Sequence, residues 1–389
     1  MNKYKLQNFI KKRKCTLLGI GPMSINCVDA TIELSSEFNI PLFLIASRRQ
    51  IDSYELGGGY VNNWTTKQFA DYVIDKDKKG NILLSRDHGG PWQNSKEIDD
   101  NLSLNRAMES AKKSFLDDIR SGFQVIHIDP SIDIHKKTSV DEILERIYEL
   151  YSFCYSQAQR LGKEILFEIG TEEQSGGTNS QEELKYVLNS MRIFCEKHNF
   201  PFPTFVVIQT GTKVKEMKNV GSLDSPIRVL DQLPSEIQIP KMIEICNEYS
   251  IMMKEHNADY LSDESLHWHP RLGIHASNVA PEFGVIETKN LLKILEENNL
   301  KNLSERFLEL SFNSGKWKKW LLDISQTSDR EKSIIAGHYI FSNGECKELK
   351  KEASQELSKK GINLENFLKD SIKKSIIRYL THFRLIKTK

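Results

Sequence analysis

The sequence lacks the features that mark secreted, zinc-ribbon and membrane proteins. No two cysteines form a Cys-x-x-Cys pair, so there is neither a disulfide framework nor a zinc ribbon, and the thiols are expected to be reduced. No apolar run approaches the ~18 residues that a membrane span needs. The basic start at residues 11–14 precedes an apolar run too short for a secretion signal. We therefore expect a soluble cytoplasmic protein with no membrane partner.

The chain also lacks an excess of either charge. Lys and Arg number 54 and Asp and Glu 53, which leaves a net charge of +1. A nucleic-acid-binding protein would be expected to carry a basic face, so this balance argues against a nucleic-acid partner. No Gly-x-x-x-x-Gly-Lys-Ser/Thr loop is present, which argues against a phosphate-binding-loop kinase.

What the sequence does have is a series of short apolar runs separated by helical patterns. The runs predict eight strands, at residues 15–20, 41–46, 82–86, 123–128, 164–169, 204–209, 250–255 and 271–275. Near-continuous apolar runs are typical of parallel strands buried on both faces. Alternation with helices such as 140–150 predicts an α/β fold, a (β/α)8 TIM barrel. An open, doubly wound parallel sheet is the alternative.

The alternation stops near residue 300. Residues 302–324, 330–340 and 348–385 are rich in Lys, Glu, Leu and Ile and predict helices without strands between them. We therefore expect a barrel domain over residues 1–300 and a helical C-terminal extension over residues 301–389, packed on the barrel.

Chemically reactive side chains follow several of the predicted strands. Because the C-terminal ends of barrel strands form the active site of such folds, these side chains are expected to meet. His88 and His256 with Glu172 would supply two imidazoles and a carboxylate, a set that suits zinc, manganese or another first-row divalent ion. Asp87 is a candidate general acid or base, and Glu172 could serve in that role instead. His127 and Asp129, two residues apart, point to the same face of their strand.

The strand-end residues occur in recognisable motifs. They are Gly58-Gly59-Tyr60, Asp87-His88-x-Gly90-Pro91, Ile126-His127-Ile128-Asp129, Gly170-Thr171-Glu172, Gln209-x-Gly211 and His256-x-x-Asp259-Tyr260. In this order, over about residues 15–290, the chain resembles the non-catalytic (Z) subunit family of class II tagatose-1,6-bisphosphate aldolases. Proteins of that family are also labelled tagatose-6-phosphate kinases, and its relatives look like sugar-phosphate 4-epimerases. The resemblance implies His88 as a metal ligand and Asp87 as a proton carrier, and we expect Glu172 or Asp129 to be the second catalytic group that moves a proton.

Further residues are candidates for binding substrate. Arg48 and Arg49 follow the second predicted strand, and guanidinium groups pair with phosphate or carboxylate in bidentate fashion. Glycine loops let a backbone approach a ligand closely. The complete set expected to contact substrate is Arg48, Arg49, Gln50, Gly58, Gly59, His127, Gln209, Asp259, His275 and Asn278.

Two functions remain open from the sequence. The first is a metal-dependent, class II aldolase-like enzyme that epimerises or cleaves a ketose or ketose phosphate, including an acidic sugar facing Arg48 and Arg49. The second is a non-catalytic barrel subunit that stabilises an aldolase partner, with residues 211–240 and the C-terminal helices as contact surfaces. We expect a homo-oligomer in either case.

Overall fold

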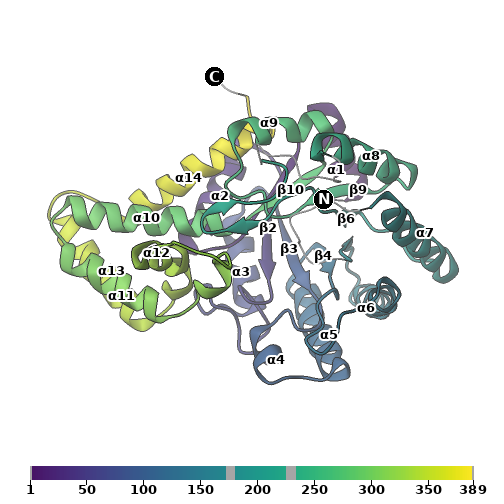
Figure 1. Ribbon diagram of the computed structural model, residues 1–389, viewed down its shortest axis with the longest axis horizontal. Coiled ribbons are helices and arrows are strands. Elements are labelled where there is room, and N and C mark those ends of the chain that lie inside the picture. Colours follow the sequence, from purple (N-terminus) through teal and green to yellow (C-terminus); the bar gives the residue numbers. More distant parts are fainter. Residues whose placement is uncertain (1, 172–179, 225–233, 388–389) are drawn as a thin grey trace.

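The computed structural model describes residues 2–171, 180–224 and 234–387. Within these ranges, eight parallel strands close into a barrel in the order β1-β10-β9-β6-β5-β4-β3-β2 (Figure 1). The strands are β1 (Leu17–Ile20), β2 (Leu42–Ser47), β3 (Ile82–Gly89), β4 (Val125–Ile128), β5 (Leu166–Ile169), β6 (Phe205–Val207), β9 (Met252–Glu255) and β10 (Ala276–Val279). The predicted (β/α)8 barrel is confirmed, and the open sheet is excluded by the pairing of β1 with β10.

Helices surround the barrel. Those that follow successive strands are α2 (Ile25–Phe38), α3 (Thr66–Lys76), α5 (Leu104–Ser121), α6 (Val140–Arg160), α7 (Gln181–His198), α8 (Ser235–Glu248), α9 (Asp263–Leu272) and α10 (Pro281–Glu297). Two further helices are α1 (Lys3–Arg13) before β1 and α4 (Ser95–Asp99) after β3. α6 begins at a capping box of Ser139 and Glu142 and buries Ile143, Ile147 and Leu150 against the strands. None of the described helices is long and apolar enough to cross a membrane.

Seven of the predicted strands overlap observed ones, and the eighth prediction is wrong. Arg271 and Leu272 belong to the last turn of α9, and the strand is β10, four residues further on. β10 was not predicted as a strand because its middle residues, Ser277 and Asn278, are polar and interrupt the apolar run. Ser277 donates a hydrogen bond to Glu255, while Asn278 reaches the centre of the barrel mouth, so both are buried with partners.

The C-terminal extension forms a helical lobe beside the barrel (Figure 1). Its elements are α11 (Lys301–Asn313), the 3-10 turn η1 (Lys318–Trp320), α12 (Asp329–Ile340), α13 (Gly344–Ser358) and α14 (Leu364–His382). Leu291 of α10, Phe307 and Leu349 share one apolar cluster, whereas Ile372 and Tyr379 of α14 belong to the barrel core. The division of the chain at residue 300 stays a prediction.

A short hairpin ties this lobe to the barrel mouth. The hairpin, β7 (Val214–Lys215) and β8 (Lys218–Asn219), lies in the segment after β6. The backbone N–H of Glu216 donates to the carbonyl of Trp320 over 2.9 Å, and Lys215 Nζ donates to the carbonyl of Lys319 over 2.7 Å. η1 is thereby held at the end of the barrel where the reactive residues gather.

Candidate active site

A β-bulge places both Asp87 and His88 in the barrel mouth. In the pairing of β3 with β4, Arg86 lies opposite Ile126 and Gly89 opposite Ile128, so three steps on β3 match two on β4. An extra residue of this kind re-aims the side chains around it, which strict alternation would send to opposite faces. His88 has φ +45°, a strained value for a residue with a side chain. The bulge therefore explains how two adjacent residues come to share one site.

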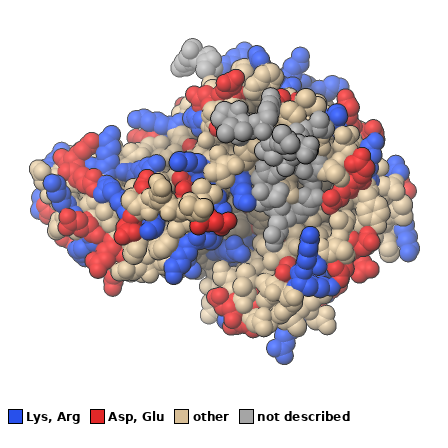
Figure 2. All heavy atoms as spheres, in the orientation of Figure 1, with Lys and Arg blue, Asp and Glu red and all other residues tan. Residues whose placement is uncertain are grey.

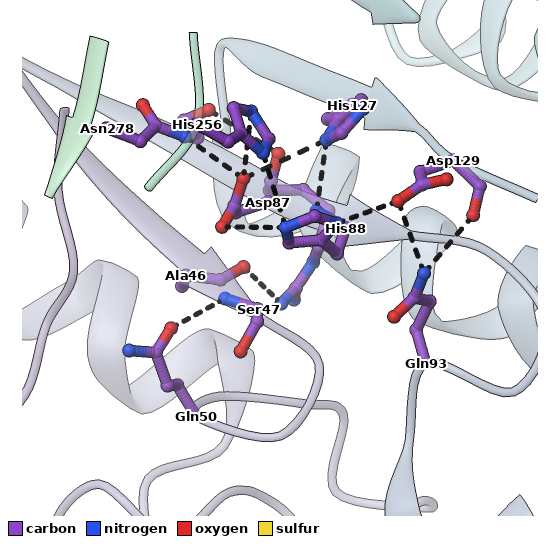
Figure 3. A network of polar contacts seen from close by, with 12 residues as sticks. Ala46, Ser47, Gln50, Asp87, His88, Gln93, His127, Asp129, His256 and Asn278 are labelled. Atoms are coloured by element: carbon purple, nitrogen blue, oxygen red, sulfur yellow. Dashed lines mark hydrogen bonds and ion pairs between the residues drawn. The ribbon is translucent and has the colours of Figure 1, made fainter. Parts of the chain in front are cut away.

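Two histidines in the mouth are each fixed by a carboxylate. Nδ1 of His88 lies 2.7 Å from Oδ2 of Asp129, and Nε2 of His256 lies 3.2 Å from Oε1 of Glu168 (Figure 3 shows His88, Asp129 and His256). A carboxylate accepts, so each ring carries its proton on the nitrogen that faces the carboxylate. The other ring nitrogen is then left with a free lone pair. This carboxylate–histidine arrangement is the usual support of metal-binding imidazoles.

The two remaining ring nitrogens face one another. Nε2 of His88 and Nδ1 of His256 are 3.3 Å apart. Two lone pairs at this distance repel each other unless a cation lies between them, either a proton or a metal ion. Tetrahedral zinc with ~2.0–2.1 Å bonds to nitrogen holds its ligand atoms about 3.3 Å apart. The spacing of the two nitrogens therefore fits a shared divalent ion.

Asp87 lies beside this pair. Its Oδ1 accepts a 3.2 Å hydrogen bond from Nδ2 of Asn278, and its carboxylate oxygens lie 3.9 Å from His88 Nε2 and 3.7 Å from His256 Nε2. Burial opposes ionisation of Asp87, but the neighbouring His88 and His256 outweigh it and lower its pKa. Asp87 is consequently an ionised acceptor next to the imidazole pair.

His127 and Glu168 stand side by side on β4 and β5. They are paired in register, and Nδ1 of His127 lies 3.7 Å from Oε1 of Glu168. That nitrogen also accepts the backbone N–H of His88 at 3.1 Å, while Nε2 of His127 has no partner among the described residues. The other oxygen of Glu168 accepts from Lys254 Nζ at 2.7 Å, a fully buried ion pair below the mouth.

The acidic and basic groups of the cluster shift one another's pKa values. Burial disfavours the protonated form of His88, yet Asp87 and Asp129 outweigh it and raise its pKa to about 9. Burial likewise disfavours the ionised form of Asp129, but His88 lowers its pKa to about 2. Glu168 has its pKa lowered to about 2 because Lys254 and the nearby histidines outweigh its burial. Burial lowers the pKa of His256 and so favours its neutral, ligating form.

The donor set fits a divalent metal. Asp87, His127, Glu168 and His256 offer ligand atoms within 4.8 Å of one another, and His88, His127 and Asp129 form a second such group. Imidazole and carboxylate together suit zinc, manganese and related ions. The 3.3 Å spacing of the facing nitrogens of His88 and His256 gives the same indication. A buried group of acidic and histidine side chains could therefore hold a metal here.

The comparisons with known proteins bear on this site. The sequence model of the D-tagatose-1,6-bisphosphate aldolase subunit GatZ/KbaZ-like family matches residues 7–193. The chain is GatZ/KbaZ-like over those residues. The resemblance inferred from the strand-end motifs is thereby confirmed, and the matched region includes Asp87, His88, His127, Asp129 and Glu168. No curated protein sequence matches the chain.

Solved structures share the fold of this chain. A probable tagatose 6 phosphate kinase from Sinorhizobium meliloti 1021 matches with a TM-score of 0.73 and 15% identity, covering 94% of this chain and 100% of its own. The fructuronate-tagaturonate epimerase UxaE from Cohnella laeviribosi matches at 0.59 and 11%, covering 97% and 86%. Fructose-bisphosphate aldolase from Campylobacter jejuni matches at 0.55 and 11%, covering 98% and 94%. At these identities the likeness establishes the barrel fold alone.

Several residues predicted to bind substrate have other partners in this barrel. Arg48 is buried, with ion pairs to Asp52 at 3.1 Å and Glu97 at 2.6 Å and a bond to the carbonyl of Gly90. Its guanidinium joins the loops after β2 and β3 and is not available to a phosphate. The prediction for Arg48 is therefore corrected: it is a structural ion-pair residue.

The glycine loop after β2 is also internally satisfied. The N–H of Gly58 donates to Ser53 and that of Gly59 donates to Trp64. A Cβ on Gly59 would lie 1.9 Å from the carbonyl oxygen of Gln50, so glycine is required by the loop's own backbone rather than by a ligand. Gln50 accepts from the N–H of Ser47 and lies at the mouth, in the foreground of Figure 3.

His275 and Asp259 lie away from the chemistry. Because β10 begins at Ala276, His275 is at the N-terminal end of that strand, on the side of the barrel opposite the mouth, and its prediction as a mouth residue is wrong. Asp259 accepts from the N–H groups of Ala280 and Glu282 and so caps the start of α10. Burial and the nearby Glu282 raise the pKa of Asp259 to about 8.

The remaining candidates lie at or near the mouth. Gln209 is buried two residues after β6, and Asn278 binds Asp87 across the barrel. Glu172 lies outside the described residues. Two functional side chains escaped the sequence reasoning, Glu168 and Lys254. A charged residue inside an apolar strand was the signal that could have revealed each of them.

Proposed function

We propose that this chain is a metal-dependent, class II aldolase-like enzyme that acts on a ketose or ketose phosphate by epimerisation or aldol cleavage. Its main support is that Nε2 of His88 and Nδ1 of His256 face each other at 3.3 Å, while a carboxylate fixes each ring through its other nitrogen. Two nitrogens fixed in this way repel each other when no cation lies between them. A metal ion that acts as a Lewis acid can bind both.

The residues divide into ligands and supports. His88 and His256 would hold the ion, while Asp129 and Glu168 orient their rings and Lys254 balances the charge of Glu168. When bound, a zinc or manganese ion supplies electrophilic polarisation of the sugar carbonyl. Glu172 remains a candidate third ligand or proton carrier.

Asp87 would move the proton. It is ionised, accepts a hydrogen bond from Asn278 and lies within 4 Å of both imidazoles, so a sugar hydroxyl held there could give up its proton to Asp87. The low pKa of Asp87 depends largely on the positive charge of His88. A neutral, ligating His88 would therefore leave Asp87 a stronger base. As that proton leaves, the hydroxyl carbon becomes a carbonyl, the adjacent carbon–carbon bond breaks, and its electrons pass to the fragment that carries the original carbonyl, as an enolate. Re-formation of the bond on the other face of the new carbonyl, with return of the proton from Asp87, gives the epimer.

Turnover by the purified chain tests this proposal. Ketoses and ketose phosphates are incubated with the protein alone, and products are separated by chromatography. Conversion that EDTA abolishes and added zinc or manganese restores would support the enzyme. Absence of conversion for every sugar, with the metal present, would contradict it.

A second function rests on the family description, which names an aldolase subunit. A non-catalytic barrel would raise the activity or the Tm of an aldolase partner and would convert no sugar alone. Co-purification with a class II aldolase, followed by activity and melting measurements of that partner, separates the two functions. Self-association is a further prediction, which light scattering of the purified chain would check.

A further inference from the structure

Two cations, Arg49 and Lys319, lie on the rim of the mouth although 270 residues separate them. The carbonyl of Arg49 accepts the N–H of Tyr60 at 3.1 Å, and the ring of Tyr60 lies 4.6 Å from that of Tyr339. Lys319 Nζ in turn lies 5.3 Å from the Tyr339 ring and 4.8 Å from the Trp320 ring. The three aromatic rings thus form a platform that connects the loop after β2 to η1.

η1 is fixed over the mouth by several bonds. The β7–β8 hairpin binds the carbonyls of Lys319 and Trp320, and Asn219 of the same hairpin donates to the carbonyl of Asn257. Asn257 immediately follows His256. Trp320 Nε1 also donates to the hydroxyl of Tyr339 over 3.2 Å. Lys319 is therefore held on the side of the mouth by the same segment that borders the candidate ligand His256.

Neither cation has a carboxylate within ion-pair distance among the described residues. Arg49 is partly buried, and it lies close enough to both His88 and Lys319 for its charge to oppose their protonation. Lys319 reaches solvent, yet it is crowded by protein atoms. Desolvation, with the charges of Arg49 and Lys316, lowers the pKa of Lys319 to about 7. An anion placed between the two cations would relieve this repulsion.

We propose that Arg49 and Lys319 together bind the anionic group of the substrate, a phosphate or a carboxylate, while its carbonyl end reaches His88 and His256. This inference rests on the proposed function, and it makes the helical extension a part of the site. Figure 2 shows Lys and Arg side chains around the hollow between the helical lobe and the barrel. Guanidinium and ammonium donors together suit such an oxyanion, because charge-assisted hydrogen bonds are the strong ones.

Ligand binding tests the inference without requiring turnover. Calorimetry compares D-fructose 6-phosphate, the ketose acid D-fructuronate and neutral D-fructose on metal-loaded wild type, Arg49→Met, Lys319→Met and Lys319→Arg. Lys318→Met is the matched control, because Lys318 is also on η1 and contacts the Trp317 ring instead. Melting curves of every variant check that it is folded.

The expected result is that at least one anionic sugar binds more tightly than fructose. Arg49→Met and Lys319→Met should each lower the affinity for that sugar by about 10-fold or more. Lys319→Arg and Lys318→Met should retain most of that affinity. Preference for the fructose phosphate or for the fructuronate identifies the anionic group. Unchanged affinity in both Met variants, an equal loss in Lys318→Met, or no anionic sugar bound by wild type would overturn the inference.

Failure of this inference is distinguishable from failure of the proposed function. Metal content and the effect of EDTA on turnover report on the proposed function. The difference between anionic and neutral sugars reports on Arg49 and Lys319. The anion site alone would be refuted if the metal-bearing enzyme turns over neutral ketoses and if Arg49→Met and Lys319→Met bind anionic sugars as tightly as wild type does.

Discussion

Nδ1 of His88 donates a 2.7 Å hydrogen bond to Oδ2 of Asp129, which turns Nε2 of the same ring toward His256. The carboxylate thereby decides which nitrogen of His88 is free to bind a metal. Gln93 supports Asp129 from the next loop, with its amide nitrogen 3.3 Å from the same oxygen (Figure 3). The sequence predicts Asp129 as a catalytic residue. We propose instead that Asp129 orients the metal ligand His88.

Replacing Asp129 by Asn should weaken metal binding while the barrel stays folded. The amide lacks the negative charge that fixes the tautomer of His88, so affinity should fall by roughly 10- to 100-fold. Competition with a chelating dye measures the change. Ser131→Ala is the control, because Ser131 donates to the other oxygen of Asp129 and its loss should have a smaller effect. Equal affinity in Asp129→Asn and wild type would contradict this role.

Replacing Lys254 by Met should destabilise the fold. Glu168 would remain as a buried carboxylate without its cation, which costs about 3–5 kcal/mol of unfolding free energy. Urea unfolding followed by circular dichroism measures the loss. The double variant Lys254→Met/Glu168→Gln should recover part of it, because the uncompensated charge is gone. A double variant less stable than Lys254→Met would argue against the explanation.

Replacing Asp87 by Asn should separate metal binding from catalysis. The amide oxygen can still accept from Asn278 but cannot take a proton from a sugar hydroxyl, so turnover should fall by about 10²- to 10⁴-fold with the metal retained. Elemental analysis and a turnover assay are run on the same sample. Loss of the metal would show that Asp87 is itself a ligand.

The stability of the fold should depend on pH through His275. Burial lowers its pKa to about 4 from 6.5, and its Nδ1 accepts the N–H of Met253. The unfolded chain therefore binds more protons than the folded one between these values, and wild type loses stability as the pH falls through this window. Gln at this position can accept the same hydrogen bond without titrating. The free energy of unfolding is measured for wild type and His275→Gln at pH 7 and at pH 4.5. The difference in favour of wild type should be smaller at pH 4.5, and an equal difference at both pH values would refute the assignment.

Most of the barrel could be predicted from the sequence, because buried parallel strands are apolar throughout and end in distinctive residues. β3 and its Asp87-His88 pair followed from this pattern. β10 did not, since its Ser277 and Asn278 are polar and find their partners only in the folded barrel, Glu255 on the neighbouring β9 and Asp87 on β3. The Arg48 prediction failed for a related reason: only the fold reveals that Asp52 and Glu97 meet its guanidinium.

The details of the site could not be predicted in the same way. The bulge that turns His88 inward depends on register between β3 and β4, which one-dimensional patterns do not specify. Glu168 was visible as a charge in an apolar strand, but its partners His256 and Lys254 come from another strand. The approach of Lys319 to the mouth depends on the packing of a helical lobe, for which the sequence offers no local signal.

We propose that His88 and His256 together hold one divalent ion. Elemental analysis of the purified wild type beside His88→Ala and His256→Ala, normalised to protein, checks this, with melting curves to establish that the variants are folded. We expect about one zinc or other first-row ion per wild-type chain and its loss from both variants. Wild type without metal, even after incubation with zinc and manganese, or metal retained in both folded variants, would contradict it.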